Sequence, residues 1–403
     1  QLRDSRRTFE TAISTVSCIS GQTLASALMD AGKLELALPM AEEALTLCKS
    51  KLGIEHPDTL RSMNELARAY QAAGKTDLAL PLFEETLRLR KEVLGAGHPN
   101  TLTSMNNLAS AYQSNGNLIK ALALLEETLQ LRKEVLGAEH RDTLGSLNNL
   151  ATAYQAAGKV HLAIPLFEEA LKLVRTKLGP DHPSTITVMS NLAEAHMAGG
   201  DESKALPILQ EILDLTTAKL GNEHLQSLGS LSRYAQTYVR MKDFTKAFEL
   251  SQSALNTRRM QSPREAEERR LRASFLLIAA SSLIHFDRAD EAEPMAREAV
   301  AIRQELMPDK WGYFNALSHL GESLLGHGKL AEAEPLLRDG YLGMKERAET
   351  MPAAYKATII REANQRLVKL YESLKQSEDV SRWQTDFEQF QTELEKQDPP
   401  SGR

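Results

Sequence analysis

Two kinds of chemically capable side chain recur along this chain at a fixed interval of 42 residues. Imidazoles can bind metal ions or transfer protons, and side-chain amides can hydrogen-bond the backbone of a bound peptide. Such series could form a metal site, a catalytic centre or the lining of a binding surface. The imidazoles are His56, His98, His140, His182 and His224, and the amides include Asn64, Asn106 and Asn148.

The spacing of the histidines argues against a shared metal ion. Neighbouring helices pack about 8–10 Å apart, whereas zinc ligands approach one ion to about 2.0–2.1 Å. His56 directly precedes Pro57 and Asp58. Proline suits the first position of a helix and an acidic residue suits the positive end of its dipole. The sequence therefore predicts that these histidines start helices, and it predicts no metal site and no cofactor.

No arrangement in the sequence indicates catalysis. Adjacent glutamates on a helix diverge by about 100°, so the recurring Glu-Glu pairs make poor acid–base couples. Residues 140–142 spell His-Arg-Asp, but their position in the repeat marks them as a helix start. Tyr70, Tyr112, Tyr154 and Tyr238 are expected to pack between helices. We predict no catalytic residue and no enzyme; a site hidden in the irregular region 260–350 is the alternative.

Each 42-residue unit reads as two helices. In the unit that begins at His56, apolar residues follow at helical spacing, as at Met63, Leu66 and Ala67, until Gly74. Glycine can adopt the left-handed conformation that ends many helices. A second helix follows in "TDLALPLFEETLRLRKEVL", residues 76–94, and stops before Gly95.

The repeat predicts the organisation of the chain. After Ala247 the spacing of equivalent alanines changes to 45 residues at Ala292 and then 41 at Ala333. We predict a helical extension over 1–13, six regular units over 14–265, two degenerate units over 266–350, capping helices over 351–395 and a disordered tail over 396–403. Because the chain begins at Gln1 rather than Met, we expect a piece of a longer protein.

Composition narrows the function classes. The net charge of -6 argues against a nucleic-acid partner, which requires a basic face. The apolar run 273–284 is too short to span a bilayer and predicts a buried helix rather than a membrane protein. Cys18 and Cys48 are the only cysteines. Read as free thiols, they predict a reducing compartment and a cytoplasmic protein.

The repeat resembles a known family. Ala67, Tyr70, Gly74, Ala79 and Phe83 fall where the tetratricopeptide repeat has its signature residues. The 42-residue unit is similar to the repeats of kinesin light chains, and more so to the C-terminal repeat regions of large bacterial serine/threonine kinases, although no kinase lobe is present. The resemblance implies an all-α, right-handed superhelical solenoid that binds a protein or an extended peptide in its concave groove.

The resemblance also implies which residues line that groove. Asn64, Asn106 and Asn148 are expected to contact a peptide backbone, although they could instead link neighbouring repeats. For Asn107, Asn149 and Asn191, one position later, we favour that linking role. The full predicted peptide-binding set is Arg61, Asn64, Arg68, Gln71, Asn106, Ser110, Gln113, Asn148, Thr152, Gln155, Ser190 and Glu194.

The sequence thus predicts a non-catalytic binding scaffold, the partner-recognition region of a larger signalling protein. Outlying arginines in the groove suggest a ligand with an acidic residue, although they could instead be solvated charges on exposed turns. The alternative is a module that self-associates through exposed repeat edges as a homo-oligomer, without a peptide ligand.

Overall fold

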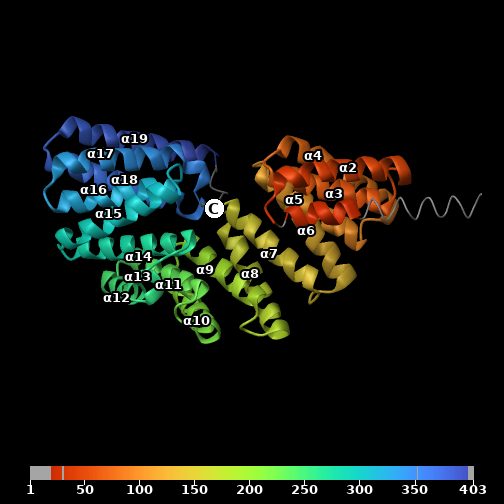
Figure 1. Cartoon of the computed structure of the whole chain (residues 1–403), viewed down its shortest axis with the longest axis horizontal. Coiled ribbons are helices and arrows are strands. Elements are labelled where there is room, and N and C mark those ends of the chain that lie inside the picture. The colour runs from red at the N-terminus through yellow and green to blue at the C-terminus, as the bar shows by residue number, and fades with distance from the viewer. Residues whose placement is uncertain (1–19, 30, 352, 398–403) are drawn as a thin grey trace, which may run out of the picture. The chain divides into compact units, whose positions relative to one another are not determined.

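A computed structural model describes residues 20–29, 31–351 and 353–397 (Figure 1). Within these ranges all regular secondary structure is helical, and no strand occurs. The predicted extension over 1–13 and residues 398–403 of the predicted tail lie outside the described residues. Lys396 and Gln397, expected in the tail, instead complete the last helix, α19.

The helices follow one another as antiparallel pairs joined by short turns. The helix at 20–29 pairs with α2 (Leu34–Leu52). The regular pairs are α3 (Pro57–Ala72) with α4 (Thr76–Leu94), α5 (Pro99–Ser114) with α6 (Leu118–Leu136), and α9 (Pro183–Ala198) with α10 (Glu202–Leu220). In sequence, α7 (Arg141–Ala156) and α8 (Val160–Leu178) come between the last two of these pairs. The later elements are α11 (Leu225–Arg240), α12 (Phe244–Leu255), α13 (Arg258–Gln261), α14 (Ala266–His285), α15 (Ala289–Leu306), α16 (Trp311–Gly326), α17 (Leu330–Glu346), the 3₁₀ turn η1 (Ala348–Thr350), α18 (Ala353–Ser373) and α19 (Ser377–Gln397).

The chain divides into two compact units, Gln1–Tyr154 and Gln155–Arg403. Unit 1 contains α2 to α6 and nearly all of α7. Unit 2 begins with the last two residues of α7 and contains α8 to α19. Each unit is described by itself below.

The histidine series starts the first helices, as the sequence predicts. His56 Nδ1 accepts a hydrogen bond from the backbone N–H of Asp58 at 3.2 Å. The other four histidines bond the residue two positions on in the same way, at 3.1 to 3.2 Å. Each imidazole thus satisfies one of the backbone donors that a helix start leaves unpaired.

Glycine ends both helices of a regular repeat. Gly74 closes the turn between α3 and α4 with φ of 71°, and Gly95 follows α4 with φ of 89°. Side chains with a Cβ atom rarely adopt these angles. The core lies between the paired helices, where the signature residues Ala67, Ala79 and Phe83 are fully buried.

The irregular region differs from the repeat in two ways. The short helix α13 stands between α12 and α14, and α12 has 12 residues where earlier second helices have 19. The apolar run 273–284 lies within α14, where Phe275 and Leu276 are buried, which confirms the predicted buried helix. None of the helices in the described part of the chain is long and apolar enough to cross a membrane.

Candidate peptide-binding face

Asparagine side chains join consecutive repeats of unit 1. Asn107 Nδ2 on α5 donates to Asn64 Oδ1 on α3 at 3.1 Å. Asn149 Nδ2 on α7 donates to Asn106 Oδ1 on α5 at 2.8 Å. The linking role predicted for Asn107 and Asn149 is therefore confirmed. Asn64 and Asn106, predicted as ligand contacts, are the acceptors of these links.

The three predicted amides differ in how much surface they offer. Asn64 is only 5% exposed, which is at odds with a direct ligand contact at this residue. Its Oδ1 is already bonded by Asn107 of the neighbouring helix α5. Asn106 and Asn148 are half-buried, and Asn148 also has an interaction partner. These two retain surface that a bound chain could reach.

The two arginines predicted on this face are already paired. Arg61 binds Asp58 at 3.1 Å and donates from Nε to Gln22 Oε1 at 2.6 Å. Arg68 binds Glu65 at 3.0 Å, one turn earlier on α3. An acidic ligand residue would have to compete with these carboxylates, so the arginines give little support to an acidic ligand.

Uncharged polar residues form the open part of the face. Gln71 Nε2 on α3 donates to Ser110 Oγ at 3.3 Å and to Ser114 Oγ at 3.1 Å, both on α5. Ser110 and Thr152 are exposed, and Gln113 is half-buried. Thr152 Oγ1 donates to Asn148 O at 2.9 Å along α7. The structure thus brings Gln71 and Ser110 together across two repeats.

The predicted residues of α9 lie in unit 2. Glu194 is exposed, and Ser190 is half-buried and donates to Ile186 O at 2.9 Å. Gln155 is half-buried and lies on α7, just past the division between the units. Ser190, Glu194 and Gln155 thus belong to a different unit from the predicted residues on α3 and α5.

The recurring tyrosines and glutamates form a second link between repeats. Tyr70 donates its hydroxyl to Glu42 Oε1 at 2.7 Å, and Tyr112 donates to Glu84 Oε1 at 2.6 Å. Tyr154 donates to Glu126 in the same way. Burial and the acceptor Glu84 raise the pKa of Tyr112 to about 12. Sequence reasoning missed these bonds, although the constant 28-residue interval was a signal for them.

Two buried arginines tie the second helices α4 and α6 to the repeat that follows each of them. Arg90 on α4 donates to Asn100 O and Ser104 Oγ, both at 2.8 Å. Arg132 on α6 repeats the arrangement with Asp142 O at 2.9 Å and Ser146 Oγ at 2.8 Å. Burial lowers the pKa of both guanidinium groups. These two guanidinium groups stabilise the packing between repeats and are not accessible to a ligand.

Cys48 occupies the position equivalent to Arg90, one repeat earlier. Its sulfur is fully buried, 3.1 Å from Ser62 Oγ, and is disulfide-bonded. The expectation of a free thiol is therefore wrong for Cys48, while Cys18 lies outside the described residues. Because Cys48 is not a free thiol, it does not support the predicted reducing compartment.

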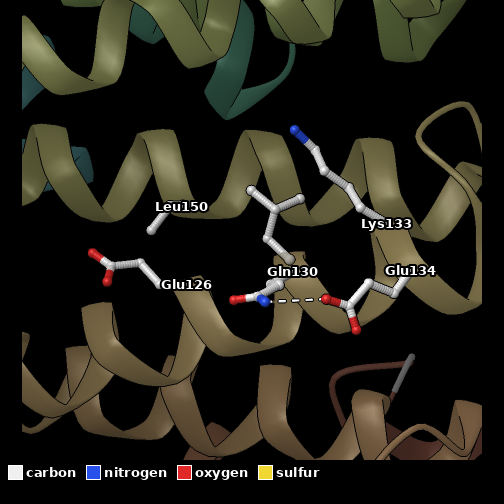
Figure 2. A pocket seen from close by; sticks show the side chains of 6 residues that line it. Glu126, Gln130, Lys133, Glu134 and Leu150 are labelled. Carbon is white, nitrogen blue, oxygen red and sulfur yellow. Dashed lines mark hydrogen bonds between the residues drawn. The ribbon is translucent and has the colours of Figure 1, made fainter.

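A shallow pocket is lined by residues of α6 and by Leu150 of α7 (Figure 2). Gln130 Nε2 donates to Glu134 Oε1 there at 3.0 Å, and Glu126 is engaged by Tyr154. Its lining consists of Glu126, Leu129, Gln130, Lys133, Glu134 and Leu150. In the described part of the chain no three histidine, cysteine or acidic residues gather as a metal site would require.

Comparisons with solved structures agree with the arrangement of paired helices. The quorum sensor NprR from B. thuringiensis, in its apo form, is 16% identical, with a TM-score of 0.60 over 92% of this chain and 98% of that one. Rap protein complexed with Competence and Sporulation Factor is 12% identical, with a TM-score of 0.54 over 94% and 99%. Kinesin-light-chain-like repeats from Podosopora anserina are 33% identical, with a TM-score of 0.46 over 50% and 95%.

No curated protein matches the sequence. A family profile, the tetratricopeptide repeat, matches residues 15–92, 69–134, 100–176, 142–218 and 187–260. These overlapping matches extend over more than half of the 403 residues, and they confirm the predicted all-α solenoid. The chain therefore belongs to the tetratricopeptide repeat family.

Proposed function

We propose that the chain is a non-catalytic scaffold that binds an extended peptide segment of a partner protein along the first helices of unit 1. The partner lies across α3, α5 and α7, where the face that does not enter the core is polar. By this proposal the chain is the partner-recognition part of a larger signalling protein. The same fold serves Rap protein, which was solved in complex with Competence and Sporulation Factor.

One observation carries the proposal: α5 and α7 expose uncharged hydrogen-bonding groups in register. Ser110 and Thr152 occupy equivalent positions on α5 and α7 and are both exposed. Beside them lie Gln113 and the half-buried amides of Asn106 and Asn148. Such groups can both donate and accept, so they suit a peptide backbone whatever its side chains are.

The proposal assigns different roles to the predicted residues. Asn64 holds α5 against α3 through Asn107 and does not touch the partner. Gln71 orients Ser110 and Ser114. Direct contacts come from Asn106, Ser110, Gln113, Asn148 and Thr152. Mutation of the asparagines would confuse binding with stability, because two of them join repeats.

A peptide-display selection on the whole chain tests the proposal. The blocked variant carries Ser110→Trp and Thr152→Trp, which place bulk on the polar face at two exposed positions. The matched control carries Ala123→Trp at an exposed position of α6. Circular dichroism verifies that all three proteins are folded. We expect one motif to be enriched on the parent and on the control, and to be lost on the blocked variant.

Two results would overturn the proposal. One is that no motif is enriched on the parent. The other is that enrichment survives on the blocked variant, which would place the ligand elsewhere.

Self-association is a second candidate, favoured by exposed apolar residues at the starts of second helices. Ile119 on α6 is 84% exposed, and Leu36 on α2 and Leu78 on α4 are also exposed. Exposed apolar groups of this kind can mark a protein interface. Under this candidate, sedimentation shows a mass that rises with concentration, and Ile119→Lys abolishes the rise. A monomer at all concentrations would exclude it.

A further inference from the structure

Two residues of unit 2 depart from the repeat and bind each other. Arg240, at the end of α11, stands where earlier first helices have Ala72, Ser114, Ala156 and Ala198. Glu202, at the start of α10, stands where earlier second helices have Thr76, Leu118 and Val160. Arg240 Nη2 donates to Glu202 Oε1 at 2.8 Å and to Met197 O at 3.0 Å. The guanidinium is therefore fixed at the junction of α9, α10 and α11.

The guanidinium group of Arg240 also contacts an aromatic ring that lies far along the chain. The Tyr355 ring centroid lies 4.9 Å from Arg240 Cζ, within the range of a cation–π contact. Tyr355 belongs to the first turn of α18, which has 21 residues where α9, α11 and α16 each have 16. The longer helix reaches α9 and packs against it.

Charged groups surround the ring. Glu194 on α9, Glu202 on α10, and Arg233 and Arg240 on α11 all act on the Tyr355 hydroxyl. Burial, followed by the field of Glu194, raises the pKa of Tyr355 to about 12. Glu194 is one of the residues that the sequence predicts to line the groove. The first turn of α18 therefore stands beside Glu194 of α9.

The remainder of α18 is anchored separately. Ile360, Ala363, Leu367 and Leu370 are fully buried between α16, α17 and α19. Arg366 Nε donates to Glu322 Oε2 at 2.7 Å. By contrast, residues 355–359 are only half-buried. Residues 355–359 are thus less buried than the core positions of α18 that follow, as expected of a segment that can open locally.

We infer that the Tyr355–Arg240 contact is a releasable latch that holds the first turn of α18 against α9 and α11. The rest of α18 stays in place when the latch opens. A partner that lies along α9 and α11 in unit 2 must displace this turn to reach Arg240. The inference goes beyond the proposed function, because it concerns α18 in unit 2 and does not depend on peptide binding in unit 1.

Hydrogen–deuterium exchange of the whole chain tests whether the first turn opens on its own. We expect the amides of residues 355–360 to exchange much faster than those of 363–371, which lie among buried side chains. In Tyr355→Ala the exchange of 355–360 should rise about two- to fivefold, as the strength of a partly exposed cation–π contact predicts. The exchange of 363–371 should not change.

A double-mutant cycle tests whether the two residues act as a pair. Tyr355→Ala and Arg240→Ala should each raise exchange at 355–360, and the double variant should show no larger effect than Arg240→Ala alone. Tyr355→Phe keeps a ring over the guanidinium and should behave as the parent does. Gln365→Ala, at an exposed position further along α18, should also leave the exchange unchanged.

Three results would overturn the latch. Equal protection of 355–360 and 363–371 in the parent would show that α18 opens only as a whole. Unchanged exchange of residues 355–360 in Tyr355→Ala would show that the ring does not hold the first turn of α18 in place. Effects that multiply in the double variant would show that the two side chains act independently. None of these results depends on the outcome of the peptide-display selection.

Discussion

The side-chain amide of Asn149 on α7 donates to Asn106 Oδ1 on α5 at 2.8 Å. Asn107 and Asn64 form the same bond one repeat earlier. Each bond joins first helices that are 42 residues apart in sequence, so the asparagine series helps to set how successive repeats pack.

Loss of the hydrogen bond between Asn149 and Asn106 should lower the stability of the packed repeats. We expect Asn149→Ala to lower the free energy of unfolding by about 1–2 kcal/mol, because Asn106 keeps a half-buried acceptor without its donor. Urea unfolding followed by circular dichroism measures the change. Thr152→Ala, at an exposed position on the same helix, should shift it by no more than about 0.5 kcal/mol. Equal effects for the two variants would contradict the linking role.

Substitution of a buried arginine should lower the free energy of unfolding more than substitution of an exposed one. Arg132 is 7% exposed and bonds Asp142 O and Ser146 Oγ. We expect Arg132→Ala to cost about 2–4 kcal/mol, because it leaves a cavity and unpaired acceptors. Arg88→Ala is the matched control, since Arg88 is exposed and pairs only along its own helix with Glu85 and Glu92. Its cost should be much smaller, because solvent screens an exposed ion pair. A control that costs as much as Arg132→Ala would refute this ranking.

The close approach of α16 and α17 depends on glycine. A Cβ atom at Gly340 would lie 2.8 Å from Ser318 N and 2.9 Å from Phe314 O, both backbone atoms that cannot move aside. Gly340→Ala should therefore cost about 2–3 kcal/mol. Gly145 in α7 has nothing within 4 Å of its added Cβ, so Gly145→Ala should stabilise the protein by about 0.5–1 kcal/mol. Thermal melting compares the two variants with the parent. A Gly340→Ala protein that melts at the temperature of the parent would contradict the prediction.

Glu293 should make part of the free energy of unfolding depend on pH in the acidic range. It is 8% exposed and accepts from Lys329 at 2.8 Å, His327 and Arg297. Its hydrogen bonds to Lys329 and His327 lower its pKa to about 2 from an ordinary value of 4.5. A lowered carboxyl pKa gives a stabilising contribution that is complete above about pH 4.5 and is lost as the pH falls towards 2.

The comparison of parent and Glu293→Gln isolates this contribution from the other carboxyl groups. The difference in their free energies of unfolding should be largest near pH 7 and should shrink between pH 4.5 and 2. Chemical unfolding at a series of pH values measures it. A difference that stays constant over that range would show that the charge of Glu293 does not stabilise the fold.

The sequence alone determined the helices and their order. His56, Gly74 and Gly95 are local signals, and helix starts and ends depend on backbone groups within a few residues. Because those signals recur every 42 residues, the family and the all-α solenoid could be predicted as well. The predicted roles of Asn107 and Asn149 were right because repetition brings equivalent positions of neighbouring repeats together.

Only the tertiary structure decided which groups stay open to a partner. Asn64 and Ser110 are both polar residues on first helices, yet one is buried and the other is exposed. Exposure depends on packing between elements, and periodicity within one helix does not contain that information. The same limit hides the contact of Arg240 with Tyr355, which lie 115 residues apart. No repeat relates these two residues, so only the folded path of unit 2 brings them together.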